Sequence, residues 1–277
     1  MSLIRTARQT LAIVEHGGYE APSGAWIDLR AAIDHAVTGT RLYTPAQTDE
    51  LLDAQLPADR VERTTVEVSD ETTQVAARRL VLDEGCEDLV LLNFASAKSP
   101  GGGFLGGARA QEEDLARASA LYACLIDQRE YYEVNRACGH AVYTDHLIWS
   151  PSVPFFRVEA DALLDRPFSS SVITCPAPNA RALARDWDPL AYEARLRRRA
   201  GKILAVARAR EHRTLLLGAW GCGAFRNDPE QVADAFATWL AESRFAKAFE
   251  RIVFAVWDTR GVNRPAFEGR FARLTRG

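Results

Sequence analysis

Apolar residues in the first sixty positions recur at helical spacing and are interrupted by turn signals. Residues 3–16 place their apolar side chains on one face of a helix, and the Gly17-Gly18 pair predicts the end of that helix. A hairpin around Pro22-Ser23-Gly24 is predicted to follow at residues 19–29. Two short helices are predicted after it, one at residues 32–37 and one that begins at Thr44-Pro45. We therefore expect residues 1–60 to form a mostly helical N-terminal extension.

Beyond residue 61 the pattern changes to strands that alternate with helices. Residues 88–94 form a nearly unbroken apolar run, which is typical of a strand buried on both faces. The other expected strands lie at residues 64–68, 147–150, 171–175, 213–218 and 251–257, and the expected helices lie at 71–82, from Gln111 as one long helix, at 188–210 and at 229–248. This alternation predicts a three-layer α/β fold with a mixed central sheet, and ligands of such sheets bind beyond the carboxyl ends of the strands.

A glycine-rich loop follows the buried strand at that edge. It leads from Asn93 to Glu113 and holds five glycines within residues 101–107, so that its backbone can approach a ligand without the obstruction of a Cβ. Free N–H groups that lead into a helix N-terminus suit an anionic or polyhydroxylated ligand. The spacing matches neither a Walker A loop nor a dinucleotide fingerprint. A flexible surface loop is the alternative interpretation.

A second glycine loop, residues 218–229, also follows an apolar strand, and Asn227-Asp228-Pro229 marks the start of the next helix. Two such loops that face each other are able to hold a diphosphate between them. Phe225 suits stacking on a base or ribose, or alternatively packing in the core. Cys222 is more typical of a small residue in a tight turn than of a nucleophile, because no basic partner lies nearby in the sequence.

Glu112 and Glu113 stand at the start of the helix that follows the first loop. Adjacent residues on a helix point about 100° apart, so the two carboxylates are unable to flank one glycosidic bond from opposite sides. One carboxylate can instead serve as acid and then as base while the other holds hydroxyl groups. Taken alone, such a pair is also typical of surface residues that compensate the helix dipole.

Composition and charge exclude several classes of function. The 277 residues carry 34 basic and 37 acidic side chains, and this net charge of −3 excludes a basic coat for nucleic acid. Five cysteines without a CxxC pair indicate reduced thiols, and five histidines without HxH or HExxH spacing indicate no metal site. No apolar run reaches the roughly 18 residues of a membrane span, and the N-terminus lacks an apolar signal core, so we expect a cytoplasmic protein. The charged run Arg195–Lys202 is interpreted as a solvated helix face, with a docking patch for a polyanion as the lesser alternative.

Three glycines, seven intervening residues and then Gln-Glu-Glu form a specific signature. The segments LNFASAKSPGGGFLGGARAQEE, ITCPAPNA and GAWGCGAFRNDP resemble the compact bacterial-type branch of the poly(ADP-ribose) glycohydrolases, over most of residues 61–277. The resemblance implies a macrodomain-like catalytic domain at 61–277 behind an accessory N-terminal extension at 1–60. It further implies hydrolysis of the ribose–ribose O-glycosidic bonds of poly(ADP-ribose), with ADP-ribose as the product and with no cofactor and no metal. Poly(ADP-ribose) and poly-ADP-ribosylated proteins are then the expected partners, and reversal of ADP-ribosylation in the response to DNA damage is the expected context.

The resemblance also implies residue roles by position. Glu113 is expected to act as catalytic acid and base, Glu112 to hold ribose hydroxyls, and Gln111 to shape their subsite. Two backbone segments are expected to bind the ligand, the terminal-ribose loop Gly101, Gly102 and Gly103 and the diphosphate loop Gly221, Cys222, Gly223, Ala224 and Phe225. Ser96 stands within a run that is richer in asparagine in related macrodomains, and it is expected to supply a ligand contact. For the adenine we nominate Phe267, with anchoring of a helix beside Phe271 as the alternative.

We therefore hypothesise a monomeric, cytoplasmic poly(ADP-ribose) glycohydrolase that binds neither membranes nor nucleic acid directly. One alternative is a reader that holds the ends of ADP-ribose chains without cleaving them, and such a reader has no need of a carboxylate at Glu113. The other alternative is a hydrolase of mono-ADP-ribosylated proteins, which a product assay distinguishes.

Overall fold

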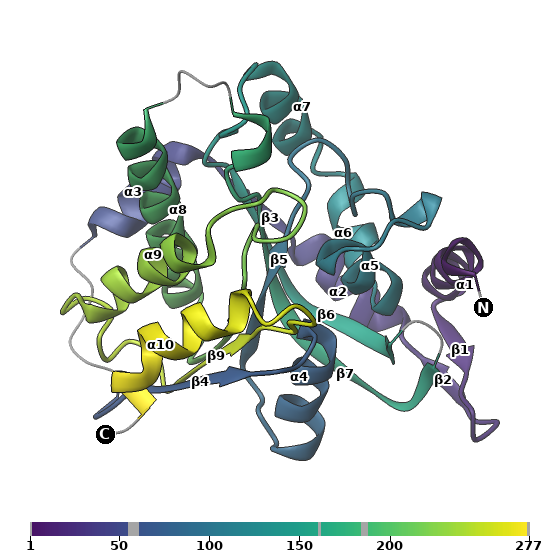
Figure 1. The fold of residues 1–277 in the computed structure, drawn as a ribbon. Helices are drawn as coiled ribbons and strands as arrows, with labels where there is room; N and C mark the ends of the chain where they lie inside the picture. Colours follow the sequence, from purple (N-terminus) through teal and green to yellow (C-terminus); the bar gives the residue numbers. More distant parts are fainter. Residues whose placement is uncertain (1, 55–60, 160–161, 184–187, 276–277) are drawn as a thin grey trace.

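The computed structural model describes residues 2–54, 61–159, 162–183 and 188–275. A seven-stranded sheet runs through the molecule with helices on both faces, so the expected three-layer fold with a mixed sheet is confirmed (Figure 1). In spatial order the strands are β3 (Arg41–Tyr43), β6 (Leu147–Val158), β7 (Ala162–Cys175), β5 (Leu89–Phe94), β8 (Thr214–Gly218), β9 (Arg251–Ala255) and β4 (Thr65–Ser69).

Most neighbouring strands are parallel and end at one edge of the sheet. β5 pairs in parallel with β7 and β8, and β9 pairs in parallel with β8 and β4. β6 is antiparallel to both β7 and β3. The carboxyl ends of β4, β5, β7, β8 and β9 therefore lie together, and the loops that follow them are brought to one location.

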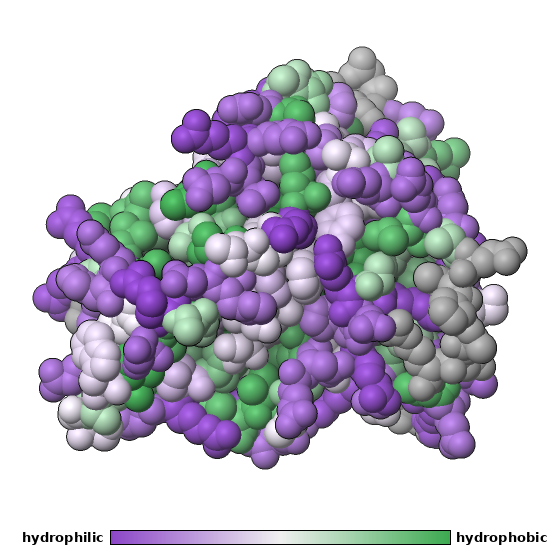
Figure 2. Space-filling model, turned by 180° about the vertical axis from the view of Figure 1, so that it is seen from behind, coloured by the Kyte–Doolittle hydropathy of each residue, from purple (hydrophilic) through white to green (hydrophobic). Residues whose placement is uncertain are grey.

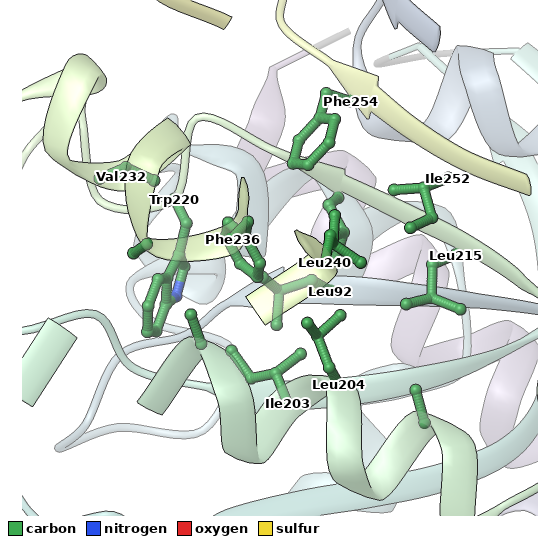
Figure 3. Close-up of a cluster of buried hydrophobic side chains, with 14 of the residues drawn as sticks. Leu92, Ile203, Leu204, Leu215, Trp220, Val232, Phe236, Leu240, Ile252 and Phe254 are labelled. Carbon is green, nitrogen blue, oxygen red and sulfur yellow. The ribbon is translucent and has the colours of Figure 1, made fainter. Parts of the chain in front are cut away.

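Each face of the sheet is buried by its own layer of helices. Val90 and Leu92 of β5 pack with the layer formed by α3 (Pro45–Asp53), α8 (Pro189–Ala209), α9 (Pro229–Ala241) and α10 (Asn263–Thr275). Leu89 and Leu91 pack with the opposite layer, which includes α2 (Arg30–Gly39), α4 (Thr73–Arg78), α5 (Gln111–Ala118), α6 (Leu121–Ile126) and α7 (Arg129–Ala137). Figure 3 shows part of the first layer, where Trp220, Phe236 and Phe254 gather over the sheet. Alternate residues of β5 thus pack against opposite layers, so both faces of the strand are buried, and this explains its unbroken apolar sequence.

The N-terminal region is mostly helical, as the sequence predicted, but it is joined to the sheet. It holds α1 (Leu3–His16), the hairpin of β1 (Gly18–Glu20) and β2 (Trp26–Asp28), and then α2, β3 and α3. Gly17 ends α1 with a left-handed φ of +76° and donates its N–H to Ile13 O at 2.9 Å. β3 pairs with β6 and forms an edge of the central sheet. The division into domains at residue 60 lies outside the described residues and stays a prediction.

The one long helix expected from Gln111 is wrong, because α5, α6 and α7 take its place. Ser119 ends α5 in an extended conformation and forms a β-bridge with Phe155 of β6. Its hydroxyl donates to Leu115 O at 2.7 Å and accepts from Leu121 N at 3.2 Å, so that one side chain closes one helix and opens the next. The helix is interrupted by the contact of Ser119 with β6, and the helical periodicity of the sequence gives no sign of that contact.

Other predicted elements differ in length. β6 and β7 continue far beyond the expected residues 147–150 and 171–175 as an antiparallel hairpin, in which Phe155 and Phe168 stack with ring centroids 5.1 Å apart. α9 ends at Ala241 because Glu242 is extended, with ψ 142°. The helix expected at 71–82 is α4 followed by a π-helical turn at Arg79–Asp83.

The run Arg195–Lys202 is not uniformly solvated, so that interpretation is wrong for two of its residues. Arg199 and Lys202 are buried and bind Asp145 at 2.8 Å and 3.1 Å. Arg199 also donates to Pro176 O at 2.9 Å. Desolvation by burial raises the pKa of Asp145, but the charges of Arg199 and Lys202 outweigh it and bring that pKa down to about 2. The cluster ties α8 to the segment before β6.

The surface carries hydrophilic side chains with smaller apolar areas between them on the face seen in Figure 2. No helix in the described part of the chain is both long and apolar enough to cross a membrane. The five cysteines are free thiols, and the described residues contain no group of three or more His, Cys, Asp or Glu side chains arranged to hold a metal ion.

The variant Asp145→Asn is expected to lower the free energy of unfolding by about 3 to 5 kcal/mol, because it leaves the buried Arg199 without a counter-charge and leaves Lys202 with Asp49 alone. The pKa of Asp145 is depressed in the folded state, so its contribution is complete above about pH 4 and is lost as the pH falls toward 2. Chemical denaturation at neutral pH measures the difference, with Asp53→Asn at the exposed end of α3 as the control. Equal stability of the Asp145→Asn variant and the wild type would contradict this account.

Candidate active site

A cavity of about 1080 Å³ opens at the carboxyl ends of the parallel strands. Its wall is formed by the loop after β5, the start of α5, the loop after β8, and the segments that follow β4 and β9. The lining includes residues 71–74, 94–99, 102–103, 109–115, 223–225 and 255–257, together with Leu3 from the start of α1. The two glycine loops predicted from the sequence therefore border one cavity.

Gln111 anchors the start of α5 to the sheet. Its Oε1 accepts from Phe94 N at 2.8 Å, and its Nε2 donates to Leu92 O at 2.8 Å and to Thr73 Oγ1 at 3.2 Å. The side chain thus joins α5 both to β5 and to α4. Because the amide is engaged with the protein on both sides, its geometry suits shaping of the site more than direct contact with a ligand.

Glu112 is buried beneath the first loop, with 3% of its surface exposed. Its Oε2 accepts from Ser96 N at 2.6 Å, and its Oε1 accepts from Asn93 Nδ2 at 3.3 Å. Desolvation by burial is the main cause that raises the pKa of Glu112 to about 8. The two hydrogen bonds oppose this rise, and the nearby charge of Glu113 adds to it. Glu112 therefore holds a proton at neutral pH.

Glu113 has one engaged and one free oxygen. Its Oε1 accepts from Gly103 N at 2.9 Å, whereas its Oε2 is buried and has no hydrogen-bond partner among the described residues. The side chain is 8% exposed and lines the cavity, so the interpretation of the pair as dipole-compensating surface residues is wrong. A buried acceptor without a partner is costly, and at a cavity wall it marks a place where a ligand atom completes the hydrogen bonding.

Gly102 lies against both carboxylates. Its φ of +58° is left-handed, and a Cβ at this position would collide with Glu113 Oε1 and lie 3.0 Å from Glu112 Oε2. The first loop uses many of its N–H groups internally, since Ser96 Oγ accepts from Lys98 N and Ser99 N. Two further N–H groups of this loop are not free for a ligand, because Ser96 N and Gly103 N bind the two carboxylates.

Free backbone donors occur instead in the second loop. The N–H groups of Gly221, Gly223, Ala224 and Phe225 have no acceptor in the part of the chain that the structure describes. The φ of Gly221 is +77°, and a Cβ there would collide with the side-chain amide of Asn227. Such a run of N–H groups just before the N-terminus of α9 suits an anion.

The first loop and second loop place most of the predicted ligand residues at the cavity. Ser96, Gly102, Gly103 and Gln111 line it, as do Gly221, Gly223, Ala224 and Phe225. The Phe225 ring lies 6.1 Å from the Tyr143 ring, and both side chains belong to the lining. An aromatic wall thus stands beside the free N–H groups of the second loop.

Gly101 and Cys222 lie outside the lining. A Cβ on Gly101 would meet Phe104 and Tyr122 at 3.1 Å, so this glycine permits close packing of the loop on α6. Cys222 donates its N–H to Ala219 O, and burial raises the pKa of its thiol to about 12. The turn interpretation of Cys222 agrees with this placement, because the thiol is not activated as a nucleophile.

Phe267 is fully buried, so the expectation that it contacts adenine is wrong. Its ring packs beside Phe254 and Phe271, with centroids at 5.4 Å and 6.5 Å. The alternative, in which it anchors an amphipathic helix with Phe271, is correct.

Several residues of the cavity were missed by the sequence analysis. Trp257 lines it directly after β9 and is 63% exposed, although it was placed only within an expected strand. Its position after an apolar parallel strand was a usable signal, because loops at that edge carry ligand sites. Arg109 lies within the quoted signature but was given no role. No local signal indicates that Leu3 reaches the cavity.

A family model describing the catalytic domain of microbial-type poly(ADP-ribose) glycohydrolases matches residues 7–158. The chain belongs to this family. The poly(ADP-ribose) glycohydrolase from Thermomonospora curvata shares 46% identity, with a TM-score of 0.93 over 97% of this chain and 99% of that chain. Its structure with the inhibitor ADP-HPD gives 45% identity and a TM-score of 0.91 over the same shares. The enzyme from Deinococcus radiodurans in complex with ADP-ribose gives 44% identity and a TM-score of 0.80, over 88% of this chain and 98% of that chain. No curated protein matches the chain.

In this microbial-type poly(ADP-ribose) glycohydrolase, the two halves of the signature form one structural unit. The glycines cover the carboxylates because Gly102 has no side chain and Gly103 donates to Glu113. Gln111 fixes the helix that carries both acids. The seven residues between Gly103 and Gln111 form the stretch of chain that folds back from the glycine loop to the start of α5.

The variant Glu112→Gln is expected to gain stability over the wild type as the pH rises from 5 to 9. The folded pKa of Glu112 is raised to about 8, so the folded state binds a proton that the unfolded chain releases, and wild-type stability falls through this interval. The difference between the two proteins is expected to grow by about 1 kcal/mol or more.

Chemical denaturation at both pH values measures this difference. Glu15→Gln, at an exposed position of α1, is the control for removal of one carboxylate. The expectation fails if the Glu112→Gln variant and the wild type respond to pH in parallel.

Proposed function

We propose that this chain hydrolyses the ribose–ribose O-glycosidic bonds of poly(ADP-ribose) and releases ADP-ribose. The observation that carries the proposal is the buried Glu113 Oε2, which has no partner among the described residues and lies in the wall of the cavity. Membership of the family supports it, as do the relatives described with ADP-ribose and with the inhibitor ADP-HPD. A reader of ADP-ribose has no use for two buried acids that raise the cost of folding.

Glu113 serves as the acid and then as the base. With a proton, its free oxygen protonates the glycosidic oxygen, which leaves as a hydroxyl of the departing ribose as the bond breaks. The terminal ribose then carries a positive charge of oxocarbenium type. The carboxylate of Glu113 takes a proton from water, which forms the new C–O bond on that ribose, and the acid is restored. One carboxylate in both steps agrees with the adjacent positions of the two acids on α5.

Glu112 holds hydroxyl groups of the terminal ribose. The proton on Glu112 at neutral pH lets this side chain donate to a hydroxyl, and it also keeps a second full negative charge away from Glu113. Ser96 contributes through its backbone, since its N–H orients Glu112 at 2.6 Å. Gly102 and Gly103 allow the ribose to approach because no side chain stands between the loop and the acids.

The diphosphate binds to the second loop. Gly221, Gly223, Ala224 and Phe225 supply N–H donors, and Phe225 forms the adjoining aromatic wall. A diphosphate held beside the terminal ribose also stabilises the positive charge that develops there during cleavage.

The adenine binds at the end of the cavity formed by the segments after β4 and β9. Val256 N donates to Ser69 O at 2.9 Å, which joins these two segments, and residues 71–74 line the same wall. Trp257 stands there with a largely exposed ring. We assign it the aromatic contact with the base in place of the buried Phe267.

The variant Glu113→Gln is expected to lose about 10²- to 10⁴-fold in kcat on labelled poly(ADP-ribose), because the amide can neither give nor take the proton. Its affinity for ADP-ribose is expected to stay within about threefold of the wild type. Products resolved by chain length and calorimetric titration with ADP-ribose measure the two quantities. Glu133→Gln, on the exposed face of α7, is the matched control.

Each result of that assay separates the candidate functions. Release of ADP-ribose by the wild type that is lost in the Glu113→Gln variant supports the proposal. Binding without cleavage by the wild type identifies a reader. Cleavage of mono-ADP-ribosylated protein with no action on the polymer identifies the other hydrolase.

The variant Trp257→Ala is expected to weaken the binding of ADP-ribose by about tenfold, because stacking of a base on an aromatic ring contributes roughly 1 to 3 kcal/mol. Trp26→Ala removes an equally exposed ring, 62% against 63%, from β2 outside the cavity lining, and it is expected to leave the affinity unchanged. Titration calorimetry compares the two variants. Equal affinities would remove Trp257 from the adenine subsite.

The remaining expectations concern the protein in its cell. A monomeric state, a cytoplasmic location, the absence of direct nucleic-acid binding and a part in reversing ADP-ribosylation after DNA damage stay predictions.

A further inference from the structure

Arg109 lies at the wall of the cavity without a partner among the described residues. It is exposed, it lines the cavity together with Gly103 and Glu113, and its guanidinium has no hydrogen bond or ion pair with any described residue. Arg79, by contrast, is engaged with Glu67 and Glu71. A guanidinium without a protein partner at the wall of a cavity is suited to bind an anionic group of a ligand.

The backbone around Arg109 is held firmly, although its side chain is not. Arg117, a buried residue of α5, donates to Ala108 O at 2.8 Å. Ala108 N donates to Gly103 O at 3.2 Å, and Asp114 N donates to Ala110 O at 3.0 Å. The residues on both sides of Arg109 are therefore tied to the glycine loop and to the start of α5. This arrangement fixes the origin of the side chain relative to Glu113.

The acids nearest to Arg109 in the sequence do not neutralise it. Asp114 binds Arg117 at 2.5 Å. Glu113 directs one oxygen to Gly103 N, and Glu112 is engaged with Ser96 N and Asn93 beneath the loop. The positive charge of Arg109 is thus available at the rim of the cavity whose wall also holds Glu113, the acid of the proposed cleavage.

The polymer itself carries an anion close to the scissile bond. The oxygen that leaves on cleavage is a hydroxyl of the adenosine ribose of the preceding unit, and the same ribose carries a diphosphate on its 5′ carbon. A second diphosphate therefore follows the scissile bond after a single sugar. The free N–H groups of the second loop serve the diphosphate of the unit that is retained, and they belong to a different wall of the cavity.

We propose that Arg109 binds the diphosphate of the departing unit and so provides a subsite for the chain on the far side of the scissile bond. A guanidinium forms paired hydrogen bonds with phosphate oxygens, which orients the leaving ribose toward Glu113 as well as adding affinity. The subsite rests on the proposed function. It makes a polymer a better substrate than an ADP-ribose unit attached to an uncharged group.

Two substrates test the proposal with this chain and its variants. One is poly(ADP-ribose), and the other is an aryl glycoside of ADP-ribose, which has the same retained unit and a leaving group without phosphate. Arg109→Ala is expected to lower kcat/KM on the polymer by about tenfold and to leave kcat/KM on the aryl glycoside within about twofold. Arg109→Lys keeps the charge without the paired donors and is expected to recover part of the loss. Arg166→Ala removes an exposed arginine of β7 outside the cavity lining and is the matched control for charge.

The outcomes separate this subsite from the function on which it rests. A selective loss on the polymer supports the subsite. An equal loss on both substrates overturns it, since Arg109 would then act on the retained unit or on the fold, and unchanged activity on the polymer overturns it as well. If the wild type cleaves neither substrate, the proposed glycohydrolase activity itself fails.

Discussion

The geometry of the site depends on two hydrogen bonds from a glycine-rich loop to a pair of buried carboxylates. Ser96 N binds Glu112, and Gly103 N binds Glu113, so each end of the loop is fixed to one acid at the start of α5. Burying two acids side by side is unfavourable, and the protein reduces the cost by supplying backbone donors and by leaving a proton on Glu112. The loop and the acids therefore require each other. Without the carboxylates the loop loses its anchors, and without the loop the carboxylates lose their partners and their cover.

The sheet brings the remaining parts to this pair. Parallel strands end at a common edge, so the loops after β5 and β8 face one cavity, and the ends of β4 and β9 extend it to one side. The first loop is closed upon itself and the acids, whereas the second loop retains free N–H groups. This division assigns the chemistry of bond cleavage to one loop and the recognition of charge to the other. The aromatic side chains Phe225 and Trp257 stand in separate parts of the wall.

Local patterns predicted what is decided locally. α1 was predicted with correct ends because an amphipathic run meets Gly17, whose left-handed conformation terminates the helix. Both glycine loops and both acids were found because strand, loop and helix follow one another in the sequence. Features that depend on distant partners were not found. Ser119 interrupts a helix through its contact with β6. Arg199 is buried because it pairs with Asp145, a residue 54 positions earlier in the chain that local pattern does not connect to it. Phe267 was misassigned because a ring that anchors a helix and a ring that meets a ligand have the same sequence pattern.

The position of β9 has a consequence for how the protein comes to be folded. β9 lies between β8 and β4, and its pairing joins Thr65 to Arg251. β9 must therefore be synthesised and paired with β8 before β4 can join the sheet. Contacts between residues so distant along the chain slow folding, since the entropy of closing a long loop is lost before the pairing compensates it. During synthesis the cavity stays incomplete until Trp257 leaves the ribosome, because Trp257 and Leu3 line the same cavity. A nascent chain that lacks β9 also lacks part of this cavity, so a ligand of the cavity stabilises the fold fully only once β9 is in place.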